Sequence, residues 1–321
     1  MAGAMAGSAI LELRDPSPKL RLLTLTVNNT CNLSCPHCYL QYAGEDRFIS
    51  DEVVAWLLNS ACDRIAIVGK EPLATNESAL RSWDIIKRAA AAGKRVSLIT
   101  NGLGLDYLPA DLDDVVDFVD VSFDGGPESY QRYRGPSFTK LVQRMARRAS
   151  HGFRRFRALS VLSSATIDSL EDVLLVADLD EVEILMLSPY VPTHNDGINS
   201  VAPVPLDRIL ASLSDSPRFR HSDKALLLLA THELAIIGQD PDALNALVDH
   251  LGLRSKIAFI DRDPLELGVL RVTYDGYVMT PLQSLHPAEY PALTIQVMDK
   301  PIDDLYAALR ANVNTARYHA N

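Results

Sequence analysis

The sequence predicts an α/β protein, a partial (β/α)6 barrel of the TIM type with a C-terminal α/β extension. Two observations favour this class. Between about residues 20 and 190, short β-rich runs alternate with helical patterns at a regular interval, which is typical of a parallel sheet with helical crossovers. The 321 residues are 47% hydrophobic and 22% charged, a composition that fits one large or two modest globular domains.

Six segments carry the strand signal. They are residues 23–29, 64–68, 95–100, 118–122, 157–162 and 183–187. Because crossovers between parallel strands are right-handed, a curling sheet has all its helices on one side, and the carboxyl ends of the strands meet at one mouth. We therefore expect the chemistry at that mouth.

The helices between these strands have recognisable ends. Ser50 is the predicted N-cap of a helix with acidic residues in its first turn, and Ser78 is predicted to open a helix that Gly93 ends. A third helix is predicted to end near Gly152. Each helix therefore spans one crossover.

The chain changes character near Pro189, where YVPTHNDGINSVAPVP predicts a long loop. We expect three parts: an N-terminal segment over residues 1–20, partly disordered; the barrel over residues 20–190; and an extension over residues 191–321 that covers the mouth. The predicted helices of the extension are residues 205–213, 223–236, 241–251 and 302–312. GVLRVTYDGYVM predicts a β-hairpin with a type I′ turn at Asp275-Gly276.

Charge and hydropathy exclude two classes of partner. Lys and Arg number 31 against 41 Asp and Glu, a formal net charge of -10, so the chain has no overall basic footprint for a nucleic acid. No run of 18 apolar residues occurs, and the opening MAGAMAGSAI lacks the charged start and long apolar core of a signal peptide. The sequence therefore predicts a cytoplasmic protein with no membrane or nucleic-acid partner.

Three of the four cysteines lie in one short segment, TCNLSCPHCYL, directly after the first predicted strand. Cys31, Cys35 and Cys38 are too close together to staple distant parts of a fold through disulfides, but three thiolates on one loop can converge on a metal centre. Structural zinc sites and ferredoxin clusters use four protein ligands, so a 4Fe-4S cluster with three ligands keeps one iron open for a small molecule. A zinc site completed by His37 or by a distant histidine is the alternative.

The segment CNLSCPHCY after a first strand resembles the cluster motif of the radical S-adenosylmethionine superfamily. The resemblance covers roughly residues 20–190. It implies two cofactors, a 4Fe-4S cluster held by the three cysteines and S-adenosylmethionine. In that family, reductive cleavage of S-adenosylmethionine at the open iron releases a 5′-deoxyadenosyl radical, which abstracts hydrogen from a substrate. The cofactors then carry the hard chemistry.

Further segments are similar to those that surround S-adenosylmethionine in the family. VGKEPL resembles the Gly-Gly-Glu-Pro segment that receives the amino group, with Lys70 at the second glycine, which we expect to be tolerated. Residues 100–102 and 122–125 resemble segments that line the methionyl and ribose parts, and GGPESYQRYRGPSF resembles a linker whose arginine binds the carboxylate. The residues implied to bind S-adenosylmethionine are Tyr39, Gly69, Glu71, Pro72, Thr100, Asn101, Ser122, Asp124, Arg134, Ser163 and Leu187. Tyr39 either packs against adenine or only shields the cluster from water.

The linker and the hairpin resemble the peptide-modifying branch of the family, whose extension commonly carries cysteines for further clusters. Here no cysteine follows Cys62, so we expect a single cluster and favour epimerisation, rearrangement or radical addition over net oxidation. The expected substrate is a peptide or amino-acid-derived molecule of natural-product or modified-peptide biosynthesis. The expected partner is an external one-electron reductant, flavodoxin- or ferredoxin-like. Tyr190, His194 and Tyr274 are candidate substrate or hydrogen-transfer residues.

Three alternatives stay open. The first is the same chemistry on a sugar or nucleotide intermediate. The second is a non-enzymatic iron-sulfur or metal-binding electron-transfer protein that uses the same three cysteines. The third, prompted by Lys70, is a protein that no longer binds S-adenosylmethionine. Formation of 5′-deoxyadenosine after reduction separates an active enzyme from the last two.

Overall fold

A computed structural model of the protein describes residues 15–38, 46–191, 201–230, 240–260, 262–280, 295–296 and 300–318. The strands of these residues are β1 (Leu22–Thr26), β2 (Arg64–Val68), β3 (Arg95–Thr100), β4 (Phe118–Ser122), β5 (Phe156–Leu162), β6 (Val182–Pro189), β7 (Ala225–Ala230), β8 (Ile257–Ile260), β9 (Val269–Val272), β10 (Tyr277–Met279) and β11 (Ile295–Gln296). They form one sheet in the order β11-β10-β9-β1-β2-β3-β4-β5-β6-β7-β8. Neighbours from β9 to β8 are parallel, whereas β10 pairs antiparallel with β9 and with β11.

The six strands predicted before residue 190 are confirmed as β1 to β6. The bounds of β2, β3 and β4 are as predicted, and β5 and β6 are slightly longer. β1 is shorter than the predicted residues 23–29, because Asn28 leaves the parallel pairing and forms an isolated antiparallel bridge with Phe48. The strand therefore ends at Thr26, and the chain continues into the cysteine loop.

The described helices are α1 (Asp51–Leu58), α2 (Asn76–Ala91), α3 (Pro127–Arg134), α4 (Phe138–Ser150), α5 (Leu170–Leu174), α6 (Leu206–Asp215), α7 (Pro217–His221), α9 (Pro241–His250) and α11 (Ile302–Tyr318). Ser50 caps α1 as predicted, since its Oγ accepts from the N–H of Val53 at 3.3 Å. α2 begins earlier than predicted, because Thr75 is its N-cap and accepts from the N–H of Ser78 at 3.1 Å. Gly93, at φ 75°, follows its end.

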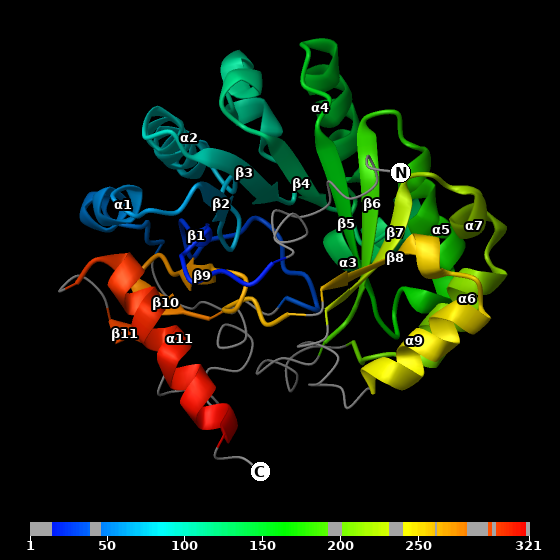
Figure 1. The fold of residues 1–321 in the computed structure, drawn as a ribbon. Coiled ribbons are helices and arrows are strands. Elements are labelled where there is room, and N and C mark those ends of the chain that lie inside the picture. The colour runs from blue at the N-terminus through cyan, green and yellow to red at the C-terminus, as the bar shows by residue number, and fades with distance from the viewer. Residues whose placement is uncertain are drawn as a thin grey trace.

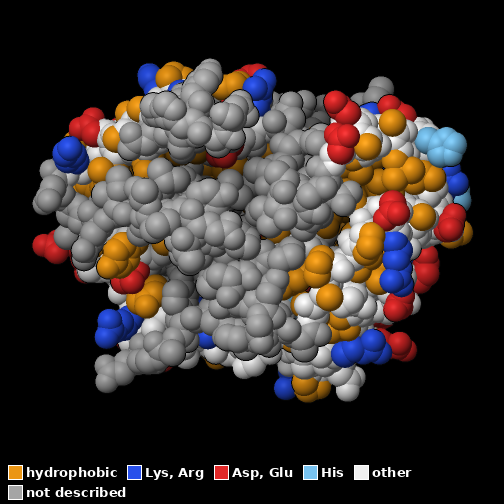
Figure 2. Space-filling model, turned by 90° about the horizontal axis from the view of Figure 1, so that it is seen from below, with side chains coloured by type: hydrophobic (Ala, Val, Ile, Leu, Met, Phe, Trp, Pro, Cys, Tyr) orange, Lys and Arg blue, Asp and Glu red, His pale blue; other side chains and the backbone are white. Residues whose placement is uncertain are grey.

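Helices cover the outer side of the sheet. Figure 1 shows the strands in an open arc with α1, α2, α4 and α5 on its outer side. Within the described ranges, no helix combines the length and the apolar character needed to cross a membrane. On the face seen in Figure 2, the described Lys and Arg side chains are interspersed with Asp and Glu around the edge.

Apolar side chains pack on both faces of the sheet. The larger core lies between the sheet and the outer helices and includes Leu23 of β1 and Leu141 of α4. A smaller cluster on the inner face includes Leu22 of β1 and Met186 of β6. Successive strand residues point to opposite faces, so Leu22 and Leu23 belong to different clusters. Covering of both faces is expected for parallel strands.

The helix predicted over residues 223–236 is wrong where the structure describes it. Ala225–Ala230 form β7, parallel to β6 and β8, and residues 231–236 lie outside the described ranges. The run ALLLLA is apolar throughout, so its pattern fits a strand buried on both faces as well as a helix. Leu227 packs in the outer core and Leu226 in the inner cluster. The sheet therefore continues past the six predicted strands on this side.

The predicted hairpin is confirmed as β9 and β10, but its turn is not type I′. The N–H of Thr273 donates to the carbonyl of Tyr277 at 2.9 Å, so the loop has three residues. A type I′ turn requires a positive φ at both Asp275 and Gly276. Gly276 has a φ of 85°, but Asp275 is not in the positive-φ region. The observed loop instead places a left-handed glycine just before the second strand, the usual form of a three-residue hairpin.

The remaining predicted helices of the extension, residues 205–213, 241–251 and 302–312, are confirmed as α6, α9 and α11. α11 is longer than predicted. β9 pairs in parallel with β1, so a strand from the extension and the first strand of the chain lie side by side. The division into three parts at residues 20 and 190 stays a prediction.

Candidate active site at the carboxyl ends of the strands

Four loops carry most of the polar residues predicted for the site. Residues 31–38 follow β1, residues 69–72 follow β2, residues 101–102 follow β3 and residues 123–125 follow β4. Because β1 to β4 are adjacent and parallel, these loops lie side by side at one end of the sheet, as the sequence predicts.

The cysteine loop keeps its three thiols partly buried. Cys31, Cys35 and Cys38 form no disulfide, and the N–H of Cys38 donates to the carbonyl of Cys35 at 3.2 Å. Burial raises the pKa of Cys31 to about 11 and also raises the pKa of Cys35, because a thiolate loses hydration there. A metal centre provides the positive charge that stabilises buried thiolates. This set of donors therefore fits an iron-sulfur cluster.

Two side chains of the loop tie it to neighbouring strands. Asn32 Oδ1 accepts from Nδ2 of Asn101, after β3, at 2.7 Å. His37 Nε2 lies 2.8 Å from Oδ2 of Asp124, after β4. His37 thus directs this nitrogen toward a carboxylate, whereas the zinc alternative needs a histidine nitrogen directed toward the thiols. Within the described ranges, no three His, Cys, Asp or Glu side chains are grouped so that one metal ion could bind them.

Glu71 connects the loop after β2 to the end of β3. Its side chain is buried, and its Oε1 accepts from Thr100 Oγ1 at 2.6 Å and from the N–H of Leu73 at 2.9 Å, while Oε2 accepts from the N–H of Asn101 at 2.6 Å. Burial raises the pKa of Glu71 in spite of these hydrogen bonds. The structure brings the predicted residues Glu71, Thr100 and Asn101 into one contact group.

Position 69 has no room for a side chain, because Asn28 lies too close to its backbone. A Cβ at this position would lie 2.4 Å from Oδ1 of Asn28, whose Nδ2 donates to the carbonyl of Glu71 at 2.8 Å. Lys70 lies outside the positive-φ region, so the backbone conformation there suits a lysine, as expected. Pro72 accepts a hydrogen bond from Ser82 Oγ at 2.8 Å. Asn28, which the sequence analysis did not single out, thus shapes this loop.

Asp124 and Arg134 bind each other. Oδ2 of Asp124 accepts from Nε of Arg134 at 2.7 Å and lies 2.6 Å from its Nη2, and Oδ1 accepts from the N–H of Val161 at 2.9 Å. Burial alone would raise the pKa of Asp124, but the charges of Arg134 and His37 outweigh burial and hold it well below its usual range. Asp124 is the one non-glycine residue of the described chain with a positive φ, 56°.

The remaining predicted cofactor contacts are less direct. Ser122 is half-buried at the end of β4. Ser163 is buried after β5, where its N–H donates to Thr166 Oγ1 at 2.8 Å. The side chain of Leu187 packs in the outer core, so only its backbone is available to a cofactor. Tyr39 lies outside the described residues.

The candidate substrate residues differ in position. Tyr190, at the carboxyl end of β6, is buried and packs with Tyr133 and Val201. Tyr274 lies in the hairpin loop, where burial raises its pKa against a hydrogen bond to Asn29, which places it next to the start of the cysteine loop. His194 lies outside the described residues.

Tyr130 of α3 is a residue that the sequence analysis missed. It is fully buried, and its hydroxyl has no hydrogen-bond partner in the part of the chain that the structure describes. Its spacing of four residues from Arg134 was the available signal, because residues four apart share a helix face.

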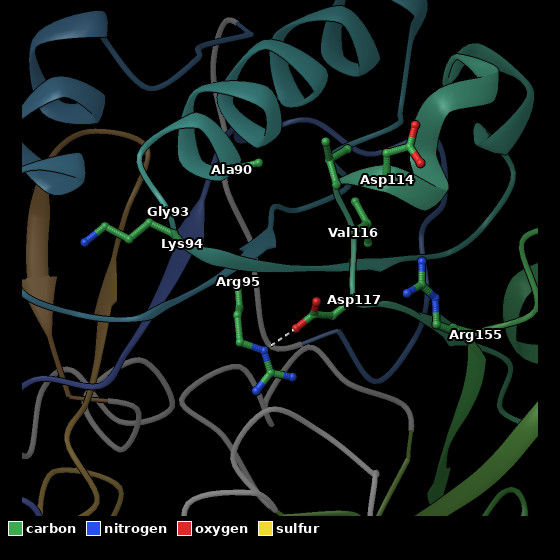
Figure 3. A pocket seen from close by; sticks show the side chains of 9 residues that line it. Ala90, Gly93, Lys94, Arg95, Asp114, Val116, Asp117 and Arg155 are labelled. Atoms are coloured by element: carbon green, nitrogen blue, oxygen red, sulfur yellow. Dashed lines mark hydrogen bonds and ion pairs between the residues drawn. The ribbon is translucent and has the colours of Figure 1, made fainter.

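A pocket lies at the other end of the sheet. It is lined by residues that precede or begin β3, β4 and β5, among them Arg95, Asp117 and Arg155. Figure 3 shows Arg95 and Asp117 joined in an ion pair, 2.7 Å between Nε and Oδ2. No cysteine lines this pocket, and active sites of such sheets lie at the carboxyl ends of the strands. We therefore place the site at the cysteine loop and not in this pocket.

The fold and the cysteine loop together define a class: an α/β enzyme whose thiol-rich loop follows the first strand of a partial barrel. Comparison with family models points to one superfamily, since residues 25–177, just under half of the chain, match the radical SAM superfamily. The matched region includes the cysteine loop and β2 to β5, and the enzymes of that superfamily use a 4Fe-4S cluster and S-adenosylmethionine.

Similar proteins agree with this family. A probable GTP 3′,8-cyclase of Methanococcus aeolicus is 26% identical over 166 residues, which are 49% of this chain and 55% of that protein. The match thus spans about half the length of this curated relative.

Solved structures are similar in fold. Native anSMEcpe with bound AdoMet gives a TM-score of 0.55 at 17% identity, covering 81% of this chain and 74% of that chain. SuiB of Streptococcus suis bound to S-adenosylmethionine gives 0.61 at 11% identity, covering 93% of this chain and 68% of that chain. Both proteins also have structures with a peptide, Cp18Cys and the precursor peptide SuiA. At these identities the likeness concerns the fold.

Proposed function

We propose that Cys31, Cys35 and Cys38 hold a single 4Fe-4S cluster with one open iron, and that the enzyme takes a hydrogen atom from a peptide or amino-acid-derived substrate. When bound, the cluster and S-adenosylmethionine supply the reductive cleavage and the 5′-deoxyadenosyl radical. The observation that carries the proposal is the loop of three half-buried thiols after β1, which Asn32 and His37 tie to the ends of β3 and β4.

The chain's own residues bind and orient S-adenosylmethionine in this proposal. Oε2 of Glu71 accepts one described hydrogen bond, from Asn101, and a carboxylate oxygen has two lone pairs, so Oε2 has capacity for the ammonium group of the cofactor. The proposed binding residues are Tyr39, Gly69, Glu71, Pro72, Thr100, Asn101, Ser122, Asp124, Arg134, Ser163 and the backbone at Leu187.

Asp124 and Arg134 are proposed to contact different parts of S-adenosylmethionine. Oδ2 of Asp124 is used by Arg134 and His37, which leaves Oδ1, with its single described donor from Val161, for a ribose hydroxyl. Arg134 presents a planar fork of donors suited to the cofactor carboxylate. Asp124 therefore holds both Arg134 and the cysteine loop in place, in addition to any contact of its own.

The proposed substrate class is supported by the linker, by the confirmed hairpin and by the likeness in fold to enzymes solved with peptides. The inner face of the sheet is apolar at β6 and β7, with Met186 and Leu226, and carries a buried ion pair between Asp120 and Arg157 on β4 and β5. Such a face suits a substrate with apolar and polar groups. Tyr190 and Tyr274 are the described candidates to contact it.

A nucleotide substrate is the second candidate. It is supported by the similarity to a probable GTP 3′,8-cyclase over 166 residues. Within the 321 residues no cysteine follows Cys62, so a redox-neutral outcome is proposed for either substrate class. An external flavodoxin- or ferredoxin-like protein would supply the electron, and a reducing compartment, proposed as the cytoplasm, would keep the thiols reduced.

Anaerobic reconstitution of the full chain tests the proposal. The parent should bind about four iron and four sulfide ions per chain, as the cluster type demands, and its reduced spectrum should change when S-adenosylmethionine is added. Dithionite should then yield 5′-deoxyadenosine. Cys35→Ala should lose the cluster.

Cys62→Ala is the matched control, because Cys62 is buried beside Ser60 and precedes β2, at the end of the sheet opposite to the cysteine loop. It should keep the cluster and the 5′-deoxyadenosine. A parent that holds zinc, or a Cys35→Ala variant that keeps the full cluster, would overturn the proposal. A deuterium-labelled peptide and a deuterium-labelled nucleotide are then supplied separately. The one that transfers deuterium into 5′-deoxyadenosine identifies the substrate class.

A further inference from the structure

The hydroxyl of Tyr130 is buried without a partner in the described chain, although its ring is firmly packed. The ring meets Phe123 and Phe138 edge to face, with centroids 6.4 Å and 5.7 Å apart, and the residue is 0% exposed. The buried tyrosines Tyr133 and Tyr306 behave differently, since their hydroxyls donate to backbone carbonyls at 2.6 to 2.9 Å. Buried hydroxyls are normally paired.

Packing does not explain this hydroxyl. A phenylalanine would fill the same aromatic cluster with Phe123 and Phe138, and it would avoid the desolvation of an unpaired polar group. An unpaired buried hydroxyl destabilises the protein relative to phenylalanine, which indicates that the partner of Tyr130 lies outside the described residues.

The position of Tyr130 on α3 indicates where that partner lies. Tyr130 and Arg134 are one helical turn apart and share a face. Arg134 binds Asp124, and Asp124 binds His37, which lies between Cys35 and Cys38 in the sequence. The helix face that carries Tyr130 is therefore joined to the cysteine loop.

Electrostatics agree with this position. Burial raises the pKa of Tyr130 to about 12, so the hydroxyl keeps its proton and can donate. The charge of Arg134 opposes the rise. The charges that add to it are those of Cys35, Asp124 and Glu71.

We propose that the Tyr130 hydroxyl donates a hydrogen bond to the cluster at its Cys35 corner and so tunes the reduction potential. The proposal rests on the proposed function, in which Cys35 is a cluster ligand. A donor near a cluster sulfur stabilises the additional negative charge of the reduced form, and such bonds are among the factors that set the potential.

Tyr130→Phe removes only the hydroxyl, and Tyr133→Phe removes a partnered hydroxyl from the same helix as a matched control. The midpoint potential of the reconstituted enzyme, without S-adenosylmethionine, is measured by redox titration with an electron paramagnetic resonance readout. Tyr130→Phe should shift the potential to a more negative value than the parent, and Tyr133→Phe should leave it unchanged.

The unfolding temperature of the cluster-free proteins is a second measurement. If the Tyr130 hydroxyl had a purely structural role, Tyr130→Phe would lower this temperature. Tyr130→Phe should unfold at the parent's temperature or above it, while Tyr133→Phe should unfold below it. An unchanged potential in Tyr130→Phe, or a lower unfolding temperature than that of Tyr133→Phe, would overturn the assignment. A parent that assembles no 4Fe-4S cluster would instead overturn the proposed function on which it rests.

Discussion

Two buried Asp–Arg pairs have their aspartates four residues apart, Asp120 on β4 within the sheet and Asp124 just after β4 at the mouth. Within the sheet, Asp120 and Arg157 form a bidentate pair, with Nε–Oδ1 2.7 Å and Nη2–Oδ2 2.8 Å. The guanidinium carbon of Arg157 lies 3.1 Å from the centroid of the Phe118 ring. At the mouth, both described contacts from Arg134 go to one oxygen of Asp124. In the Asp120–Arg157 pair both carboxylate oxygens contact the arginine. In the Asp124–Arg134 pair only Oδ2 does, so Oδ1 of Asp124 is left for other groups.

The pKa values of Asp120 and Asp124 shift in opposite directions, in agreement with the geometry of the two pairs. Burial raises the pKa of Asp120 in spite of Arg157. The pKa of Asp124 is lowered, because its interactions with Arg134 and His37 together outweigh burial. One arginine does not fully offset the burial of Asp120, whereas Arg134 and His37 together more than offset the burial of Asp124. The comparison indicates that the inner pair shapes the barrel and the outer pair positions the cysteine loop.

Asp124→Asn is expected to have the largest effect. It removes the charge that holds Arg134 and His37, so the cysteine loop loses its tie to β4. We expect a loss of unfolding free energy of about 3–5 kcal/mol from the buried arginine left without its partner. Formation of 5′-deoxyadenosine should fall roughly 10- to 100-fold, as for other groups that orient metal ligands. Iron and sulfide content, 5′-deoxyadenosine and chemical denaturation are the measurements.

A variant Asp124→Asn with the parent's cluster content and rate would break the assignment of the mouth pair to the cysteine loop. Protein that fails to fold is recognised by circular dichroism before reconstitution. Asp120→Asn serves as its control.

Asp120→Asn should lower the unfolding free energy and leave the cluster in place. Arg157 is 1% exposed and would lose its counter-charge, which costs about 3–5 kcal/mol of unfolding free energy. Cluster content per folded chain should stay at the parent's level. Replacing both partners with apolar residues, Asp120→Leu with Arg157→Met, should restore stability to within about 1 kcal/mol of the parent or exceed it. A double variant no more stable than Asp120→Asn would show that the pair has a role beyond its own charges.

Gly69→Ala should have an intermediate effect. The added Cβ would lie 2.4 Å from Oδ1 of Asn28 and 3.1 Å from the backbone nitrogen of Pro72, and such overpacking costs about 1–3 kcal/mol. The affinity for S-adenosylmethionine, measured by equilibrium dialysis with the reconstituted enzyme, should fall. Because the closest contact is a side chain, adding Asn28→Ala should cost less than the sum of the two single changes. Strict additivity in this cycle would argue against the predicted clash.

The contacts at the mouth show what sequence patterns can and cannot predict. Alternation of strands and helices predicted β1 to β6 and the mouth, because periodicity is a local property. It failed at residues 225–230, where every position is apolar and the period is lost. The cysteine motif located the loop, but the pairing of Asp124 with Arg134 depends on distances between segments that no local pattern contains. Asn28 was missed for the same reason, whereas Tyr130 had a local signal in its spacing of four residues from Arg134.

Asp117→Asn should have the smallest effect and completes the comparison with a third Asp–Arg pair. Asp117 lies just before β4 and binds Arg95 at 2.7 Å in the pocket of Figure 3, at the end of the sheet away from the cysteines. The side chains of Arg95 and Asp117 are 48% and 34% exposed, so solvent screens the pair and its contribution is about 0–1 kcal/mol. The unfolding free energy should fall by no more than this, and the difference should shrink further in high salt. The cluster content and the formation of 5′-deoxyadenosine should equal those of the parent. A clear loss of activity would mean that the amino ends of the strands also communicate with the cysteine loop, and the distinction between the inner, outer and surface pairs would then fail.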